Sequence, residues 1–383
     1  MHFVLAPGGV FWGDSKINVG DHYVAFSFRS NRDRVAGSGC RQRRWKGLAR
    51  PDRARVKADL DFLCSDDLQG RETGTPGEAK AAAYLAQKMQ ETGLAPIKVG
   101  GFGGVTPFHY RWTYYGGLGG RWMGGAEAND VVGVVPGRDP VLGGEYVFIT
   151  AHFDHLGNQD GTLYRGADDN ASGTAGLLEV MRLLKDANPR RTLVFLGVSG
   201  EEEGLLGSEA FLADSPLPIT AIKADINMDM IGRGRKGELH VMPARREGYV
   251  TTLTAEARSL AEAHGITLSA GIEDYWQDSD HYSFAQRSIP SICFNTGLHA
   301  DYHQPTDTPD KIDYNRLTTV VKIVRDLALE TANADSVPAV LPGSVWQSWA
   351  WGPYHSPNLI QDSPTIEKIK AAGETFAIPG FGR

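Results

Sequence analysis

A chain of 383 residues is long enough for one large α/β domain with extensions and can bury a sizeable core. Its formal net charge of -7 gives no basic face of the kind that nucleic acid requires, so we expect no nucleic-acid partner. The three cysteines, Cys40, Cys64 and Cys293, are too widely separated to form a zinc knuckle or a redox motif, and none requires a disulfide.

Apolar stretches are interrupted by glycine, charged or polar residues, and none approaches the roughly 20 residues needed to cross a bilayer. We therefore expect a soluble protein with no membrane partner. The first residues, MHFVLAPGGVFWGDSKINVGD, lack the basic leader, apolar segment and cleavage site of an export signal, so we expect no signal peptide in this chain. Cellular location and oligomeric state stay open.

Composition divides the chain into three parts. Residues 1–55 form a basic N-terminal extension, which we interpret as a solvated arm because no aromatic residues alternate with its arginines. Residues 56–333 carry the periodic apolar patterns of the main domain. Residues 334–383 form a tail rich in proline and tryptophan, which we interpret as a packing element rather than a substrate-binding lip.

The main domain begins with two predicted helices. The apolar spacing from Val56 to Leu63 suits a short helix, and Thr75-Pro76-Gly77 opens a longer one that ends at Gly93. Residues 100–125 are rich in glycine and aromatic residues without a clear period, and we expect an irregular loop and an edge strand there.

Strand and helix patterns then alternate to the end of the main domain. Predicted strands are VVGVVPG, YVFITA, TLVFLGVS, AIKADINMD and IPSICFN, and predicted helices are GTAGLLEVMRLLKDA, GLLGSEAFLADS, TLTAEARSLAEAHG and NRLTTVVKIVRDLALETA. Such alternation predicts an α/β fold with a mostly parallel central sheet and helices on both faces. In sheets of this kind, functional sites form where loops leave the carboxyl ends of the strands.

Acidic residues and histidines gather directly after these predicted strands. They are His152, Asp154 and His155 after YVFITA, Glu201, Glu202 and Glu203 after TLVFLGVS, Asp229 at the end of AIKADINMD, and Asp280, His281, His303 and Asp307 around IPSICFN. Carboxylates placed together raise one another's pKa, and a divalent cation removes that cost. Mixed imidazole and carboxylate ligands favour zinc or cobalt over calcium or magnesium, and five candidate ligands suit two ions better than one.

Six motifs in this order carry a family resemblance: AHFDHLG, GADDNASG, SGEEEGLLGS, INMDMIG, SDHYSF and DYHQPTDTPDKID. Together with GRETGTPGEAKAAAYL, they resemble the signature segments of the co-catalytic di-zinc aminopeptidases, the family of the bacterial leucyl and streptomycete aminopeptidases. The resemblance covers roughly residues 56 to 333 and makes them the catalytic domain, with the architecture of the zinc peptidases. Members of this family are often secreted or periplasmic.

The resemblance implies a role for each of the matching residues. His152 and Asp229 would hold one zinc ion, Glu202 and His303 the other, and Asp169 would bridge the two. Glu201 matches the family's general base. Tyr302 matches a tyrosine that in some members donates a hydrogen bond to the oxyanion.

Several neighbouring residues have weaker assignments. Asp154 suits a carboxylate that orients His152, and we expect Asp307 to do the same for His303. His155 and His281 stay open between a supporting and a plain surface role. Asp168 and Asn170 are explained as turn and N-cap residues of the following helix.

The expected function is a metallo-aminopeptidase that acts on peptides with a free N-terminus. Another amide hydrolase with the same fold, such as a carboxypeptidase or a dipeptidase, is the alternative. Relatives also include glutaminyl cyclases, which keep one zinc, and the full set of five ligands argues against that activity. A binding protein that has lost the chemistry would show substituted ligands, and none is substituted.

Overall fold

The computed structural model describes residues 49–94, 104–114, 121–215, 217–243, 251–269 and 271–339. All of them fall in one compact unit, Gly47–Arg383. Most of the predicted basic extension, residues 1–48, and the tail from residue 340, with Trp346, Trp349 and Trp351, lie outside the described residues.

The described part of the chain is organised around an eight-stranded sheet of order β1-β2-β6-β3-β7-β10-β8-β9. The four central strands run parallel to one another, while β2, β1 and β8 join through antiparallel pairs and β9 pairs parallel with β8. The strands are β1 Gly104–Tyr114, β2 Arg121–Val135, β3 Tyr146–His152, β6 Thr192–Val198, β7 Ile222–Met228, β8 Glu238–Met242, β9 Thr267–Ser269 and β10 Ser291–Asn295. The expected mostly parallel α/β sheet is confirmed.

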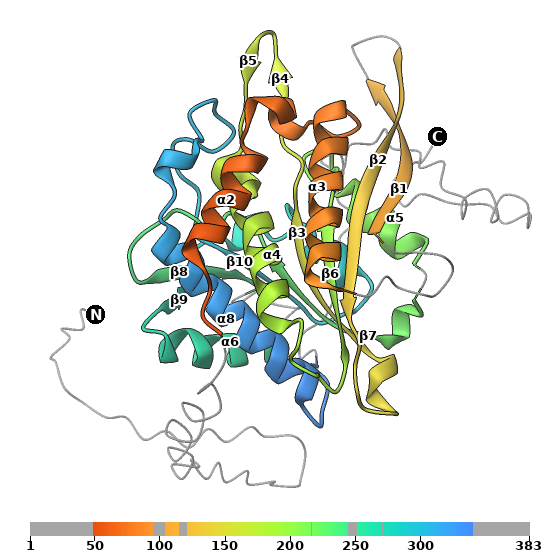
Figure 1. Cartoon of the computed structure of the whole chain (residues 1–383), viewed down its shortest axis with the longest axis vertical. Coiled ribbons are helices and arrows are strands. Elements are labelled where there is room, and N and C mark those ends of the chain that lie inside the picture. The colour runs from red at the N-terminus through yellow and green to blue at the C-terminus, as the bar shows by residue number, and fades with distance from the viewer. Residues whose placement is uncertain are drawn as a thin grey trace, which may run out of the picture. The chain divides into compact units, whose positions relative to one another are not determined.

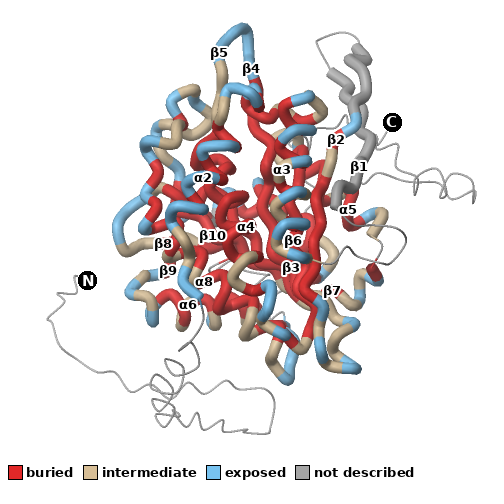
Figure 2. The backbone as a smooth tube through the Cα atoms, viewed as in Figure 1, coloured by how far each residue is buried: buried red, intermediate tan, exposed pale blue. Residues whose placement is uncertain are grey.

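The central strands are buried except at the half-buried Tyr146 and Lys223, because helices cover both faces of the sheet (Figure 2). One face carries α2 Arg53–Leu63, α3 Pro76–Thr92, α4 Gly173–Leu184 and α8 Tyr314–Asn333 (Figure 1). The other face carries α5 Leu206–Ala213 and α7 His281–Gln286, while α6 Thr252–Ala263 packs beside α8 and β9. Phe148, Phe211 and Phe284 form part of the apolar core under α5 and α7.

Helix boundaries follow their capping chemistry. The side chain of Asp52 accepts hydrogen bonds from the first backbone amides of α2, so that helix begins at Arg53, three residues before the predicted start. The helix α3 begins with Thr75 as cap and ends at Gly93, whose φ of +79° is the left-handed conformation expected of a glycine C-cap. None of the described helices is long and apolar enough to span a membrane.

Two regions of the sheet differ from the sequence expectation. The strands β1 and β2 pair as long antiparallel neighbours, where we expected a loop, an edge strand and a short strand at VVGVVPG. The strands β8 and β9 were not predicted, because each is short and completes its pairing only with partners distant in the sequence. The described cysteines Cys64 and Cys293 are buried and unpaired.

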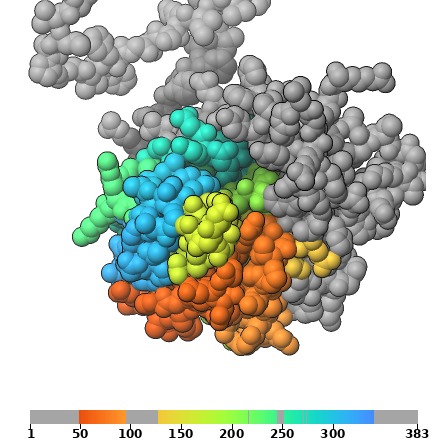
Figure 3. Space-filling model, turned by 90° about the horizontal axis from the view of Figure 1, so that it is seen from above, coloured from red at the N-terminus to blue at the C-terminus, as the bar shows by residue number. Residues whose placement is uncertain are grey.

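Sequence-distant segments share the face of the molecule that lies above the strand ends. In Figure 3 the orange-red N-terminal segments, the yellow-green hairpin region and the blue C-terminal segment lie side by side there. The hairpin consists of β4 Asn158–Gln159 and β5 Thr162–Leu163, and it contacts the short helical segment η1 Asp66–Arg71. Asn158 donates a hydrogen bond to Gln69 across this contact.

The buried side chain of Arg71 joins several of these segments through hydrogen bonds. Its fully buried guanidinium donates to the backbone carbonyls of Leu63, Phe153, Arg165 and Gly166. The loop that leaves β3 and the loop that precedes α4 are therefore held by one side chain. Both loops carry candidate metal ligands, so Arg71 fixes their spacing.

We expect Arg71→Met to lower the free energy of unfolding by at least about 3 kcal/mol, because several buried carbonyls lose their donor and each such loss costs about 1–3 kcal/mol. Urea unfolding monitored by circular dichroism measures the change. The control is Arg138→Met, an exposed arginine that binds the carbonyl of Asn188. Equal stability of the two variants would contradict the proposed contribution of Arg71.

Candidate metal centre

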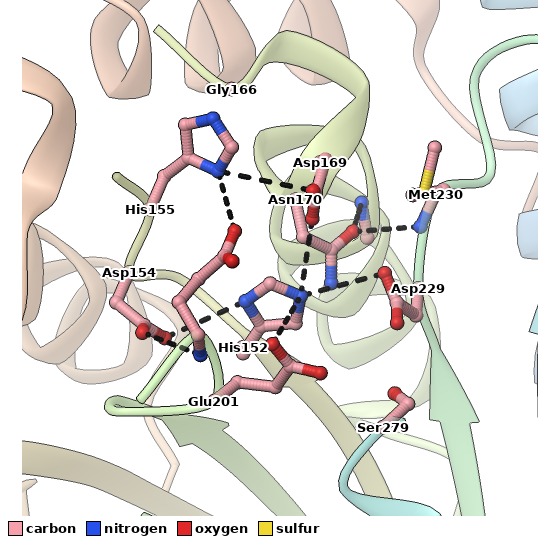
Figure 4. Close-up of polar contacts among 12 residues, drawn as sticks. His152, Asp154, His155, Gly166, Asp169, Asn170, Glu201, Asp229, Met230 and Ser279 are labelled. Atoms are coloured by element: carbon pink, nitrogen blue, oxygen red, sulfur yellow. Dashed lines mark hydrogen bonds and ion pairs between the residues drawn. The ribbon is translucent and has the colours of Figure 1, made fainter. Parts of the chain in front are cut away.

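The first group of candidate ligands lies where β3 and β7 end. His152 is the last residue of β3, and Asp229 directly follows β7, which is the parallel neighbour of β3. The Nε2 atom of His152 lies 3.4 Å from Asp229 Oδ1 and 3.5 Å from Asp169 Oδ1. Figure 4 shows these three side chains converging from different elements, with Asp169 supplied by the segment η3 Ala167–Ser172.

The second group lies on the other side of Asp169. His303 Nε2 is 3.1 Å from Asp169 Oδ2 and 3.0 Å from Glu202 Oε2. Glu202 belongs to the turn after β6, and His303 to the loop after β10, where its φ of +53° places it in the left-handed region. A non-glycine residue in this conformation is uncommon and is often found at functional sites.

Asp169 thus presents a different oxygen to each group, Oδ1 to His152 and Oδ2 to His303. Zinc bound by nitrogen and oxygen at roughly 2.0–2.2 Å in tetrahedral geometry places neighbouring ligand atoms about 3.4 Å apart. The spacing of 3.4 to 3.5 Å around His152 matches this value. The five residues brought together are those that the sequence resemblance implies.

Several buried polar atoms of the cluster have no aligned hydrogen-bond partner among the described residues. They are His152 Nδ1 and Nε2, Asp169 Oδ2 and Asp229 Oδ1. Buried polar atoms are normally satisfied, so a group of orphaned ligand-type atoms aimed at one another points to a cation that the side chains would share. Histidine and carboxylate donors in this number fit zinc.

Electrostatics without a metal support the same conclusion. Burial and the nearby Glu202 raise the pKa of Asp169, and burial raises the pKa of Glu201 well above its ordinary value. Burial alone would lower the pKa of His303, but Asp169 and Glu202 raise that pKa to about 10. Burial likewise disfavours charged His152, yet Glu201 and the other neighbouring carboxylates raise its pKa well above the ordinary value. The cluster therefore requires positive charge.

Glu201 faces the cluster without joining it as closely. Its Oε2 atom lies 4.0 Å from His152 Nε2, farther than the oxygens of Asp169 and Asp229. It lines the same pocket as Tyr302, whose ring stacks on His303 with centroids 3.9 Å apart. The pocket is also lined by the apolar side chains of Met230, Met242, Ile272 and Leu298.

Asp154 contacts one residue of each group of candidate ligands. Its Oδ1 atom lies 3.5 Å from His152 Nδ1, on the side of the ring away from Asp229, and its Oδ2 accepts hydrogen bonds from Thr73 Oγ1 and the backbone N–H of Glu202. A carboxylate behind a ligating histidine fixes the ring and its tautomer. This is the position expected of Asp154, and the role of Thr73 was not predicted.

The expectation for Asp307 requires correction. Its Oδ2 atom accepts hydrogen bonds from the backbone N–H groups of Asp168 and Asp169, so it supports Asp169 rather than His303. Asp307 follows His303 closely in sequence, which suggested the wrong partner.

Asp168 and Asn170 do more than form a turn. Asp168 accepts from the N–H of Gly232 and lies 3.2 Å from His299 Nε2. Asn170 accepts from Gly173 N–H at the start of α4, as an N-cap residue does, and also from Met230 N–H. These two side chains join η3 to the loop that follows β7, and so hold Asp169 and Asp229 in register.

The two histidines whose roles were open are both buried, which excludes a plain surface role. His155 Nδ1 lies 2.7 Å from Glu202 Oε1. His281 packs against Trp276, and burial lowers its pKa to about 3. His155 is therefore part of the surroundings of the second group, and sequence alone gave no sign of its partner.

Histidines and carboxylates at the strand ends of a parallel α/β sheet, beside a carboxylate and a tyrosine that face the same pocket, define a metal-dependent hydrolase. The model of peptidase family M28 matches residues 130–328, just over half of the 383-residue chain. The chain belongs to peptidase family M28.

Similar proteins include enzymes of more than one kind. Aminopeptidase YwaD of Bacillus subtilis (strain 168) is 28% identical over 209 residues, which are 51% of this chain and 43% of that protein. The chain thus spans less than half the length of this relative. The solved aminopeptidase from Aneurinibacillus sp. strain AM-1 matches with a TM-score of 0.60 at 18% identity, over 76% of this chain and 97% of that one. A glutaminyl cyclase from Bacteroides thetaiotaomicron matches with a TM-score of 0.58 at 19% identity, over 74% and 99%. At such identities the solved structures show the shared fold alone.

We expect Thr73→Val to lower the free energy of unfolding by about 1.5–3 kcal/mol, because the buried carboxylate of Asp154 loses a hydrogen-bond donor in a variant of nearly equal shape. Urea titration measures this change in the free energy of unfolding. Thr319→Val is the matched control, since the Thr319 hydroxyl bonds only a helix carbonyl at the surface, and it should change stability by less than about 0.5 kcal/mol. A neutral Thr73→Val variant would show that Asp154 does not depend on this donor.

Proposed function

We propose that this protein is an aminopeptidase that removes the N-terminal residue of peptides with two zinc ions and a glutamate general base. His152 and Asp229 hold one ion, Glu202 and His303 hold the other, and Asp169 bridges them. Residues 56–333 form the catalytic domain. Membership of peptidase family M28 and the similarity to proteins named aminopeptidase and zinc aminopeptidase support this activity.

The observation that carries the two-ion proposal is the position of Asp169. A carboxylate that served one ion would aim one oxygen, or both, at a single set of ligands. The two oxygens of Asp169 instead face His152 and His303 separately. Each histidine also has a carboxylate of its own, Asp229 at 3.4 Å and Glu202 at 3.0 Å. The arrangement divides into two similar halves that share one residue.

Zinc ions in such a site polarise a carbonyl and lower the pKa of a water molecule. The protein's own residues supply the proton transfers. Glu201 accepts a proton from the attacking water and delivers it to the departing amine, which suits a carboxylate whose pKa burial raises well above its ordinary value. Tyr302, whose pKa burial also raises, stays protonated and donates a hydrogen bond to the substrate oxygen as negative charge develops. Asp154 keeps the His152 ring in place.

Selection for a free N-terminus follows from the charge of the pocket. Asp169, Glu201, Asp229 and Asp278 line it. Bound zinc would offset the charge of Asp169 and Asp229, which leaves Glu201 and Asp278 as the carboxylates that attract a protonated α-amine and repel the carboxylate terminus of a peptide. This favours an aminopeptidase over a carboxypeptidase on the same fold.

Peptides that differ only at their ends test the proposal. We expect a free tripeptide to be cleaved at its first bond, with activity abolished by N-terminal acetylation and unaffected by C-terminal amidation. Chelation should remove the activity, and zinc should restore it. Cleavage that tolerated acetylation and failed on the amidated peptide would identify a carboxypeptidase instead.

We expect Asp169→Ala to reduce bound zinc more than Asp154→Ala does, because the first variant loses a shared ligand and the second only an orienting partner. Loss of an orienting partner typically costs roughly 10 to 100-fold in affinity or activity. Zinc is measured by metal analysis after dialysis, with two ions expected per wild-type chain. Equal zinc loss in both variants would show that Asp169 is not the bridge.

We expect Glu201→Gln to lower kcat by about 10³–10⁴-fold, toward the upper end of what general acid-base catalysis contributes, because the amide cannot accept the proton. The zinc content should stay at two, since Glu201 is not a ligand. Glu203→Gln is the matched control from the same turn and should retain most of the wild-type kcat. A Glu201→Gln protein that lost its zinc would show that the base and the ligand of this turn are misassigned.

A further inference from the structure

His155 is fully buried against Glu202 and has no part in the chemistry described above. We propose that His155 is a positioning residue that binds one oxygen of Glu202, so that Glu202 offers only its other oxygen to the second zinc ion. The two oxygens are already divided in this way, with Oε1 at 2.7 Å from His155 Nδ1 and Oε2 at 3.0 Å from His303 Nε2. The inference rests on the proposed two-zinc function.

The distances distinguish a positioning residue from a sixth ligand. Two ligand atoms of one tetrahedral zinc ion lie about 3.4 Å apart. The separation of 2.7 Å between His155 Nδ1 and Glu202 Oε1 is shorter than that and falls in the range of a charge-assisted hydrogen bond. The same nitrogen lies 3.9 Å from Asp169 Oδ2, too far for a hydrogen bond. These distances favour a hydrogen bond from His155 to Glu202 over a place among the metal ligands, although His155, Asp169 and Glu202 lie close enough together to hold an ion.

The imidazole of His155 is held in its orientation by its surroundings. Its backbone N–H donates to the carbonyl of Arg71, at 3.3 Å, which anchors the residue to the buried arginine. The ring packs on Gly166, where a β-carbon would lie 2.4 Å from the ring atom Cγ of His155. The ring of His303 meets it edge-on at 5.9 Å. Figure 4 shows His155 opposite His152, with its nitrogen directed at the carboxylates between them.

This hydrogen bond determines whether Glu202 binds the metal ion through one oxygen or through two. A glutamate with two free oxygens can bind a metal ion through both. With Oε1 held by His155, Glu202 binds through one oxygen, and a position stays open for water or substrate. Catalytic zinc sites depend on such an open position. Removal of the donor should therefore weaken the binding of the second ion and alter its coordination.

Two substitutions at His155 test the proposal. Asparagine places its side-chain nitrogen at the position of Nδ1 and can donate the same hydrogen bond, whereas leucine fills the space without a donor. We expect His155→Leu to weaken the binding of the second zinc ion by roughly 10 to 100-fold and His155→Asn to stay within several-fold of wild type. Zinc competition with a chromophoric chelator measures both dissociation constants without any assay of activity.

Each of the other outcomes overturns the inference. If His155 were a zinc ligand, both variants would lose affinity equally, because an amide nitrogen does not replace imidazole, and X-ray absorption would show fewer imidazoles per ion in His155→Asn. If His155 only filled space, leucine would bind zinc as well as asparagine does.

A control separates this inference from the proposed function. His264 forms a similar pair with Asp326, at 3.1 Å, far along the chain from the metal ligands, and His264→Leu should leave both zinc affinities unchanged. A wild-type protein that bound no zinc would refute the two-zinc function itself. A wild type that binds two ions, with identical affinities in His155→Leu and His155→Asn, would refute only the role of His155.

Discussion

The structure has to hold four carboxylates together against their mutual repulsion, the buried Asp169 and Asp229 and the half-buried Glu201 and Glu202. Burial raises the pKa of Asp169 and Glu201, whereas Glu202 is held ionised because the histidines beside it outweigh the effect of burial. A site that gathers these charges away from water needs compensating positive charge. The strand ends, the turns and the buried polar side chains around the cluster keep the charges close in spite of that repulsion.

Rigidity comes from polar side chains that bind backbone atoms rather than from the ligands themselves. Arg71 holds the loops before and after β4 and β5, Asp307 holds the backbone of Asp169, and Asn170 joins η3 to the end of β7. Each of these bonds joins segments that are far apart in sequence. A metal site needs its ligands within fractions of an ångström, and buried side chains of this kind fix backbone positions that loops alone would leave variable.

The central strands and the residues that cluster at their ends could be predicted from the sequence because both have local signals. A buried parallel strand is a continuous apolar run, and the ligands follow such runs directly, as His152 and Asp229 do. The strand β8 and the partners of Asp307 and His155 were missed for one shared reason. Their structure is determined by contacts across the chain, and no local pattern encodes which segment lies opposite.

The fold alone does not decide between the activities found on it. An aminopeptidase and a glutaminyl cyclase match this chain almost equally well, with TM-scores of 0.60 and 0.58. The difference must lie in a few side chains at the strand ends, since the sheet beneath them is common to both. In this chain Asp169 has a histidine and a further carboxylate on each side. A site for one ion requires only one of these two sets of histidine and carboxylate. We therefore propose that the two sets of histidine and carboxylate, with Asp154, Asp307 and His155 around them, direct this fold toward two-metal hydrolysis.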